Sequence, residues 1–157
     1  VVIGCCRRPI RFVMDHQIFR IPLLSFVFRT AGAIPIAPAR ENPEVLTQAY
    51  DRVARYLEAG EVVGIFPEGR LTEDGEICPF KTGIERIVQR TPVPVVPMAL
   101  RGLWGSFFSR RYGREMQHFP RRFWSRIELV VGELIPPEQA TSALLREQVV
   151  KLRGDWQ

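Results

Sequence analysis

Cysteine is scarce in this chain of 157 residues, which contains only three. Cys5 and Cys6 are adjacent, and Cys78 lies far from both. Three cysteines are not the even number that a disulfide framework needs, and they do not form the Cys-x-x-Cys pair of a metal site. We therefore expect free thiols in a reducing compartment.

Long hydrophobic runs are also missing. The longest one near the start, residues 21–28, ends at Arg29 and is much shorter than the roughly 20 residues that span a bilayer. No segment of this sequence is therefore expected to cross a membrane. The chain begins Val1-Val2-Ile3-Gly4, without the charged region or the cleavage site of a signal peptide, so we expect an excerpt of a longer protein.

Lysine is nearly absent, although the chain is basic. Its 22 Lys and Arg residues, all but two of them Arg, exceed its 17 Asp and Glu residues and give a net charge of +5. The planar guanidinium group suits phosphate, and a positive net charge favours anionic partners. An anionic ligand is therefore plausible, but charge alone does not identify it.

The length and an apolar content of 46% suit a single domain, expected over residues 1–157. The clearest helix has Asn42 as its N-cap and Pro43 at its first position, and Gly60 closes it. Strands alternate with helices, which predicts a layered α/β fold with a mostly parallel or mixed sheet flanked by helices. The other expected helices cover residues 18–31, 83–90 and 139–153, and the strands cover 10–14, 33–36, 62–66, 93–100 and 127–132.

Pro67-Glu68-Gly69-Arg70 directly follows the apolar strand predicted at 62–66. Ligands of open α/β sheets bind at the carboxyl ends of the strands. Gly69 allows backbone to approach a ligand, Arg70 can hold a phosphate, and Glu68 can accept a hydrogen bond from a hydroxyl or orient the arginine. The same residues would also suit a purely structural turn, so residue types alone leave both interpretations open.

The order of several motifs resembles the glycerolipid acyltransferases of the lysophosphatidic acid acyltransferase type. That family carries FPEGTR, then FK-x-G, then a V-P-I-V-P-type strand, and the resemblance covers roughly residues 10–135. The form without Thr before Arg70 is similar to acyltransferase domains joined to acyl-carrier-protein synthetase or transporter-like domains. The matching segments are Phe66-Pro67-Glu68-Gly69-Arg70, Phe80-Lys81-Thr82-Gly83, Val93-Pro94-Val95-Val96-Pro97, Phe19-Arg20-Ile21-Pro22-Leu23-Leu24 and Gly32-Ala33-Ile34-Pro35-Ile36.

The resemblance implies a glycerol-3-phosphate acyltransferase-like fold and an enzyme of phospholipid biosynthesis or remodelling. Such an enzyme moves a fatty acyl group from acyl-CoA or acyl-acyl-carrier protein to a hydroxyl of a lysophospholipid or glycerol phosphate, without a further cofactor or a metal. The resemblance assigns Glu68, Gly69 and Arg70 to binding of the acceptor, and Lys81 to the rim of the same pocket. It also implies a peripheral location on the cytoplasmic side of the inner or plasma membrane, or a place within a larger membrane protein.

Two features depart from the family pattern. Its catalytic signature is His-x-x-x-x-Asp, in which His acts as general base, but His16 and His118 are followed at that spacing by Ile21 and Phe123. We therefore expect a chain truncated at its N-terminus and inactive by itself, with His16 at a strand end. The arginine that normally ends the second block is also missing, and Arg40 is the nearest candidate to replace it.

Aromatic residues and arginines interleave over residues 104–126. Aromatic rings with arginines suit a membrane surface or the acyl donor, whereas the same pattern would also suit a loop with aromatics in the core and arginines in solvent. No nucleic-acid-binding motif accompanies them, so a nucleic-acid partner is not expected. The alternative to an enzyme is a non-catalytic lipid- or phosphate-binding module of the same fold.

Overall fold

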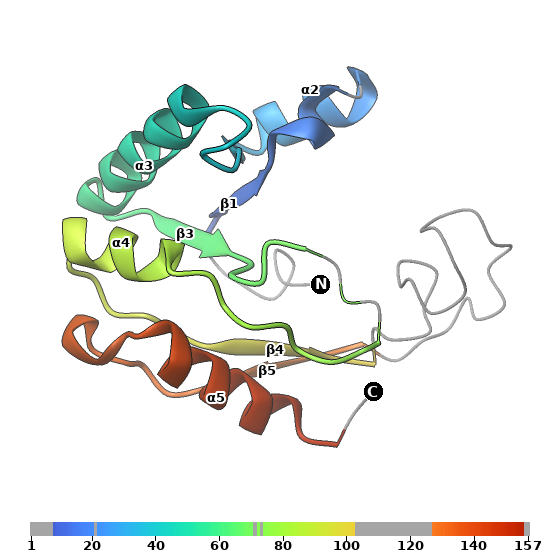
Figure 1. Cartoon of the computed structure of the whole chain (residues 1–157), viewed down its shortest axis with the longest axis vertical. Coiled ribbons are helices and arrows are strands. Elements are labelled where there is room, and N and C mark those ends of the chain that lie inside the picture. The colour runs from blue at the N-terminus through green and yellow to red at the C-terminus, as the bar shows by residue number, and fades with distance from the viewer. Residues whose placement is uncertain (1–7, 21, 71, 73, 103–126, 156–157) are drawn as a thin grey trace, which may run out of the picture. The chain divides into compact units, whose positions relative to one another are not determined.

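The computed structural model describes residues 8–20, 22–70, 72, 74–102 and 127–155 (Figure 1). These residues form two compact units. The parallel unit contains residues 8–67 and 86–93, and the antiparallel unit contains residues 68–85, 94–102 and 127–155. Whether both belong to the single domain predicted over residues 1–157 stays a prediction.

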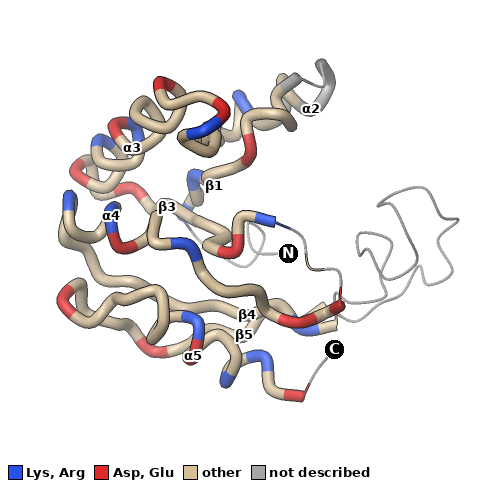
Figure 2. The backbone as a smooth tube through the Cα atoms, in the orientation of Figure 1, with Lys and Arg blue, Asp and Glu red and all other residues tan. Residues whose placement is uncertain are grey.

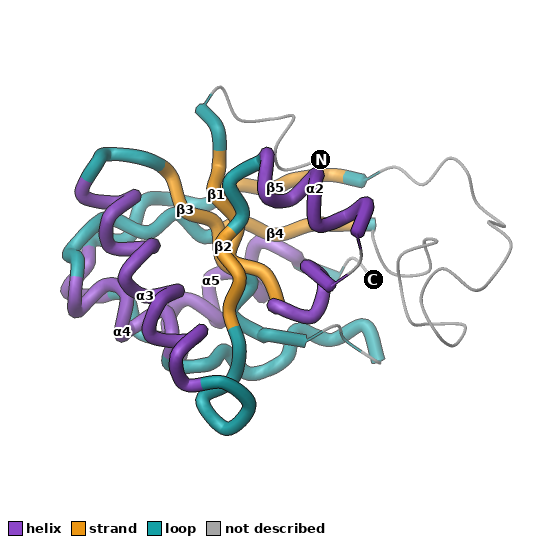
Figure 3. The backbone as a smooth tube through the Cα atoms, turned by 90° about the horizontal axis from the view of Figure 1, so that it is seen from above, coloured by secondary structure: helices purple, strands orange, loops and turns teal. Residues whose placement is uncertain are grey.

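The parallel unit is built on a three-stranded sheet, drawn in orange in Figure 3. Its strands are β1 (Ile10–Asp15), β2 (Ile34–Ile36) and β3 (Val62–Ile65), in the order β2-β1-β3 and all parallel. Val13 in the central strand is paired with Ile34 on one side and with Ile65 on the other. The predicted α/β fold with a mostly parallel sheet and flanking helices is confirmed.

Helix α3 (Pro43–Glu58) packs against β2 and β3 and supplies much of the core. Ala49 and Val53 of this helix meet Val13 and Ile34 of the sheet, and Ile34 has no exposed surface. The helix begins as predicted, because the side chain of Asn42 accepts the Val45 N–H at 3.0 Å. Helix α4 (Gly83–Arg90) adds Ile87 to the same core.

The prediction of one helix over residues 18–31 was wrong. The structure has two elements in this region, a 3₁₀ helix, η1 (His16–Arg20), and a separate helix, α2 (Pro22–Thr30). Pro22 explains the break, because proline has no N–H for the helical ladder and is tolerated at the first turn of a helix. The expected glycine end is confirmed, since Gly32 has a φ of 69° and the Ala33 N–H donates to Phe28 O at 2.9 Å.

The antiparallel unit pairs β4 (Met98–Arg101) with β5 (Glu128–Val131), and α5 (Ser142–Arg153) packs on both strands (Figure 1). The strand predicted at 93–100 was too long. Pro94 and Pro97 cannot donate to a ladder, and before Met98 only Val95 forms a bridge, with Ile135. A short 3₁₀ helix, η2 (Pro137–Gln139), precedes α5, so the final helix starts later than predicted.

Several sequence predictions lie outside the described residues, namely those for Cys5, Cys6 and the aromatic and basic stretch at 104–126. Among the helices that the structure does describe, none combines the length and the apolar character needed to span a bilayer.

Replacing Asn42 by Ala removes the oxygen that accepts the Val45 N–H, so we expect the free energy of unfolding to fall by about 1 kcal/mol. Asn42→Asp keeps an acceptor there and places a negative charge at the helix N-terminus, where it is favourable. Urea denaturation followed by circular dichroism measures both variants. Equal losses for Ala and Asp would show that the cap contributes nothing specific.

Candidate functional site

Residues 68–83 connect the end of β3 to α4 and carry four of the five predicted binding residues. Charged residues of both signs lie along this connection in Figure 2. Glu68, Gly69, Arg70 and Lys81 all belong to the antiparallel unit. We call residues 68–83 the site loop.

The carboxylate of Glu68 closes the site loop on itself. Its Oε2 accepts the backbone N–H of Cys78 at 2.8 Å, across ten residues of sequence. Hydrogen bonds to an ionised acceptor are stronger than neutral ones. The second carboxylate oxygen can still accept, but one oxygen of this predicted binding residue is used inside the loop.

Arg70 lies against Cys78 as well. Its Nε donates to Cys78 Sγ at 3.3 Å, and its side chain is on the exposed side of the loop. The pKa of Asp74 is below its usual value because the Glu76 N–H and the Thr72 hydroxyl donate to its carboxylate, with a smaller contribution from the positive charge of Arg70. The guanidinium group is thus oriented by the thiol and lies within electrostatic range of a carboxylate.

Lys81 crosses over Gly69. Its Nζ donates to Gly69 O at 3.5 Å, and Gly69 has a φ of 61°, which favours glycine. A Cβ at position 69 would lie 2.5 Å from Lys81 Nζ and 2.9 Å from its Cε. Glycine at this position therefore provides both the turn and the space for the lysine.

Arg40 belongs to a different unit from the site loop. It is exposed in the turn before α3, where Pro38 O accepts the N–H groups of Glu41 and Asn42, and it belongs to the parallel unit. The structure thus brings Glu68, Gly69, Arg70 and Lys81 together in one unit. A role for Arg40 beside them stays a prediction.

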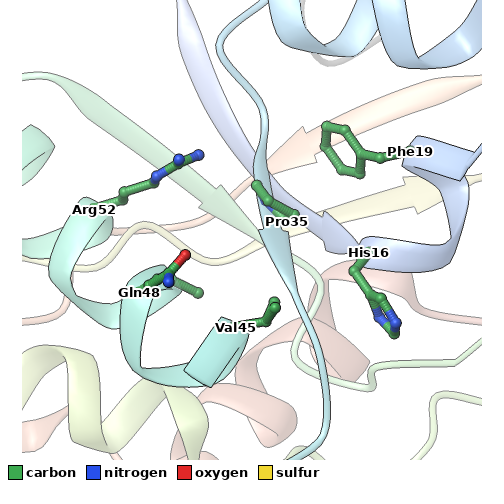
Figure 4. A pocket seen from close by; sticks show the side chains of 7 residues that line it. His16, Phe19, Pro35, Val45, Gln48 and Arg52 are labelled. Atoms are coloured by element: carbon green, nitrogen blue, oxygen red, sulfur yellow. The ribbon is translucent and has the colours of Figure 1, made fainter. Parts of the chain in front are cut away.

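His16 directly follows β1, as expected of a strand-end residue. Its Nδ1 lies 3.4 Å from Asp15 Oδ1, and the same oxygen accepts the Gln17 N–H at 2.8 Å. It lines a pocket of about 190 Å³ within the parallel unit, where Pro35 of β2 lies between the η1 side chains and Gln48 and Arg52 of α3 (Figure 4).

Sequence reasoning missed the polar contacts that α5 makes with the site loop and with the start of α4. Arg146 Nη2 donates to Ile77 O at 3.0 Å, and Arg153 Nη1 donates to Gly75 O at 3.0 Å. Glu85 Oε1 accepts from the N–H and the hydroxyl of Ser142 at 2.7 and 2.6 Å. The apolar stripe of α5 was visible in the sequence, but the partners of its polar face were not.

Metal ligands are not grouped in the described part of the chain, where no cluster of three or more His, Cys, Asp or Glu side chains could hold an ion. The polar groups of the site loop are instead arginine, lysine, a carboxylate and backbone amides. Such a set suits an anionic ligand that also carries hydroxyl groups.

Glu85 should make stability depend on pH. Hydrogen bonds from the Ser142 hydroxyl and N–H hold its pKa below its ordinary value of 4.5, against desolvation. A carboxylate with a depressed pKa stabilises the fold above the unfolded pKa and loses that effect as the pH falls through the folded pKa. Between about pH 6 and about pH 3, wild type should lose more stability than Glu85→Gln. Urea denaturation at both pH values measures this, with the exposed Glu133→Gln variant as control; equal losses for wild type and Glu85→Gln would contradict it.

Gly69→Ala should destabilise about as much as Gly60→Ala. Both glycines have positive φ, so each substitution carries a backbone cost of about 1–2 kcal/mol. A Cβ on Gly60 would meet no atom within 4 Å, whereas one on Gly69 would meet the far end of the exposed Lys81 side chain, which can move aside. Adding Lys81→Ala to Gly69→Ala should therefore change the free energy of unfolding little. Chemical denaturation of these three variants measures the differences, and a larger loss at Gly69 that Lys81→Ala recovers would contradict the prediction.

Comparison with known proteins identifies the family of this chain. The family model described as Acyltransferase matches residues 1–101. Proteins named 1-acyl-sn-glycerol-3-phosphate acyltransferase are 34% identical over 92 residues in Brassica napus and 30% identical over 100 residues in Bacillus subtilis. These matches cover 59% and 64% of this chain but 26% and 47% of the relatives, so the chain spans about a quarter to a half of their length. No solved structure matches it. With the family model covering more than half of its residues, this chain belongs to the acyltransferase family.

Proposed function

We propose that this chain holds the acceptor in an enzyme that transfers a fatty acyl group from an acyl thioester to a hydroxyl of a glycerol phosphate or lysophospholipid. The observation that carries the proposal is the site loop, in which Arg70 and Lys81 lie beside the glycine turn at Gly69. Membership of the family and the names of the relatives support the reaction class.

The chemistry of the acceptor fits these residues. A phosphate ester is a strong hydrogen-bond acceptor, and arginine can bind it through two parallel N–H groups while lysine acts as a point charge. We assign that contact to Arg70, with Lys81 at the rim. Glu68 keeps the loop closed through Cys78 and has a second oxygen that can accept from a glycerol hydroxyl.

In the reaction, the acceptor hydroxyl attacks the thioester carbonyl, a base takes the hydroxyl proton, and the thiol leaves. We assign none of the described residues to the base, because neither histidine of this chain has Asp five positions after it. The donor is an acyl-CoA or an acyl-acyl-carrier protein. The proposal requires no further cofactor.

The proposed place of action is the cytoplasmic side of a membrane. A membrane surface is supported by chemistry, because a lysophospholipid acceptor and the acylated product are amphiphilic. Phe66, two residues before Glu68, is 54% exposed although its ring stacks on Phe12 at 5.7 Å between centroids. Phe26 of α2 is 73% exposed. Exposed aromatic rings on a basic chain suit contact with anionic lipid.

Arg70→Ala should weaken the binding of glycerol 3-phosphate and of 1-acylglycerol 3-phosphate. Loss of a hydrogen bond to a charged group corresponds to roughly 10- to 100-fold in affinity. Calorimetric titration of the chain measures this, with Arg55→Ala as control because it removes the same charge from an exposed position on α3. Arg40→Ala, measured alongside, tests the acceptor-binding role that the sequence predicts for Arg40. If Arg70→Ala and Arg55→Ala bind equally well, the assignment of Arg70 is wrong.

The alternative predicted from the sequence is a binding module of the same fold without catalysis. Labelled acyl-CoA and acyl-acyl-carrier protein, supplied with 1-acylglycerol 3-phosphate to the full natural gene product, separate the two functions. Acyl transfer supports the enzyme, and binding without transfer supports the module. Absence of both overturns the proposed function.

A further inference from the structure

We propose that α5 positions the acceptor-binding residues, with Ser142, Arg146 and Arg153 holding the segment from Gly75 to Glu85. This inference rests on the function proposed for the site loop. It assigns a role to a helix that lies beyond the 101 residues matched by the family model. Ser142, Arg146 and Arg153 are positioning residues, because they contact the loop and the start of α4 rather than a ligand.

The three residues lie on one face of α5. An α-helix turns about 100° per residue, so spacings of four and seven residues place Ser142, Arg146 and Arg153 within a sector of about 40°. Ser142 donates to Glu85 at the start of α4, Arg146 to the carbonyls of Ile77 and Cys78, and Arg153 to Gly75 O and the Glu76 carboxylate. One face of α5 thus contacts the segment at three points along its length.

Cys78 connects this helix face to the predicted binding residues. Its carbonyl accepts from Arg146 Nε at 3.4 Å, its N–H donates to Glu68 at 2.8 Å, and its Sγ accepts from Arg70 Nε at 3.3 Å. All three polar groups of this residue therefore have a partner. A displacement of Cys78 would change the surroundings of both Glu68 and Arg70.

Helix α5 is itself fixed in the antiparallel unit. Arg101 of β4 donates to Leu152 O through Nε at 2.9 Å and Nη2 at 2.6 Å, and Leu145 is buried at 4% exposure. The Arg153 side chain is only 15% exposed where it meets Glu76 at 2.8 Å. The helix can therefore act as a rigid support for the loop.

The test compares Arg146→Ala and Arg146→Lys with Lys151→Ala in the full chain, in a Cys5→Ser, Cys6→Ser background. Lys151 is the matched control, because it is exposed and, among the residues that the structure describes, pairs along its own helix with Glu147 at 2.6 Å. Two readouts are taken below the unfolding transition: the Kd for glycerol 3-phosphate and the rate at which a thiol reagent labels Cys78. The second readout needs no ligand.

Arg146→Ala should raise the Kd on the order of tenfold, as for the loss of one charge-assisted hydrogen bond, and should speed the labelling of Cys78. Arg146→Lys should give a smaller change, because lysine keeps the charge but not the fork that reaches two carbonyls. Lys151→Ala should leave both readouts unchanged. The double variant with Arg146→Ala and Glu68→Gln should lose less binding free energy than the sum of the two single losses, since both substitutions act on Cys78.

The outcomes separate this inference from the proposed function. If wild type binds neither glycerol 3-phosphate here nor 1-acylglycerol 3-phosphate in the calorimetric titration, the proposed function fails, while faster labelling in Arg146→Ala would still support α5 as the element that holds the loop. If wild type binds and Arg146→Ala matches Lys151→Ala in both Kd and labelling rate, the positioning role is overturned. Should Arg146→Ala not fold, Arg146→Lys carries the same comparison.

Discussion

The hydrogen bond between the Glu68 carboxylate and the Cys78 N–H is the interaction on which the candidate site depends most directly. A loop of ten residues loses conformational entropy when its ends meet. An ionised acceptor offsets part of that cost more effectively than a neutral one would. Because Arg70 contacts the thiol of the same cysteine, closure of the loop also places a hydrogen-bond partner beside the Arg70 side chain.

Recognition of an anion at this loop depends on where the charges lie rather than on the net charge of +5. Acidic groups lie among the basic ones, and the positive charge of Arg70 already contributes to the low pKa of Asp74. A bound phosphate would share Arg70 with this internal carboxylate. Affinity for a phosphate therefore requires that Arg70 and Lys81 are held in fixed positions. The hydrogen bonds from Cys78 to Glu68 and from Lys81 to Gly69 serve this purpose, because they fix the shape of the loop.

Features set by nearby residues could be predicted from the sequence. The Asn42 cap, the Gly32 turn and the strand before Glu68 each depend on a few adjacent positions, although the residues of that strand are half-buried rather than fully covered as expected. The errors arose where a proline competed with an apolar pattern: Pro22 begins a new helix, and Pro97 precedes the first residue of β4. The types of the site residues could also be predicted. The partner of Glu68 could not, because a contact between residues ten positions apart has no local sequence pattern. The polar partners of α5 are still farther away along the sequence.

Two kinds of constraint therefore meet at the site loop. Its residue types lie within residues 1–101, which the family model matches, whereas part of its support comes from residues 142–153. A guanidinium group that donates to backbone carbonyls depends on the path of the chain and not on its side chains, so the contacts of Arg146 with Ile77 and Cys78 do not require particular side chains there. Arg153 combines both kinds of contact, because it donates to Gly75 O and to the Glu76 carboxylate. Support of this kind constrains the helix more than the loop. Arg146 and Arg153 must keep their spacing, while Ile77 contributes to these contacts only its carbonyl oxygen.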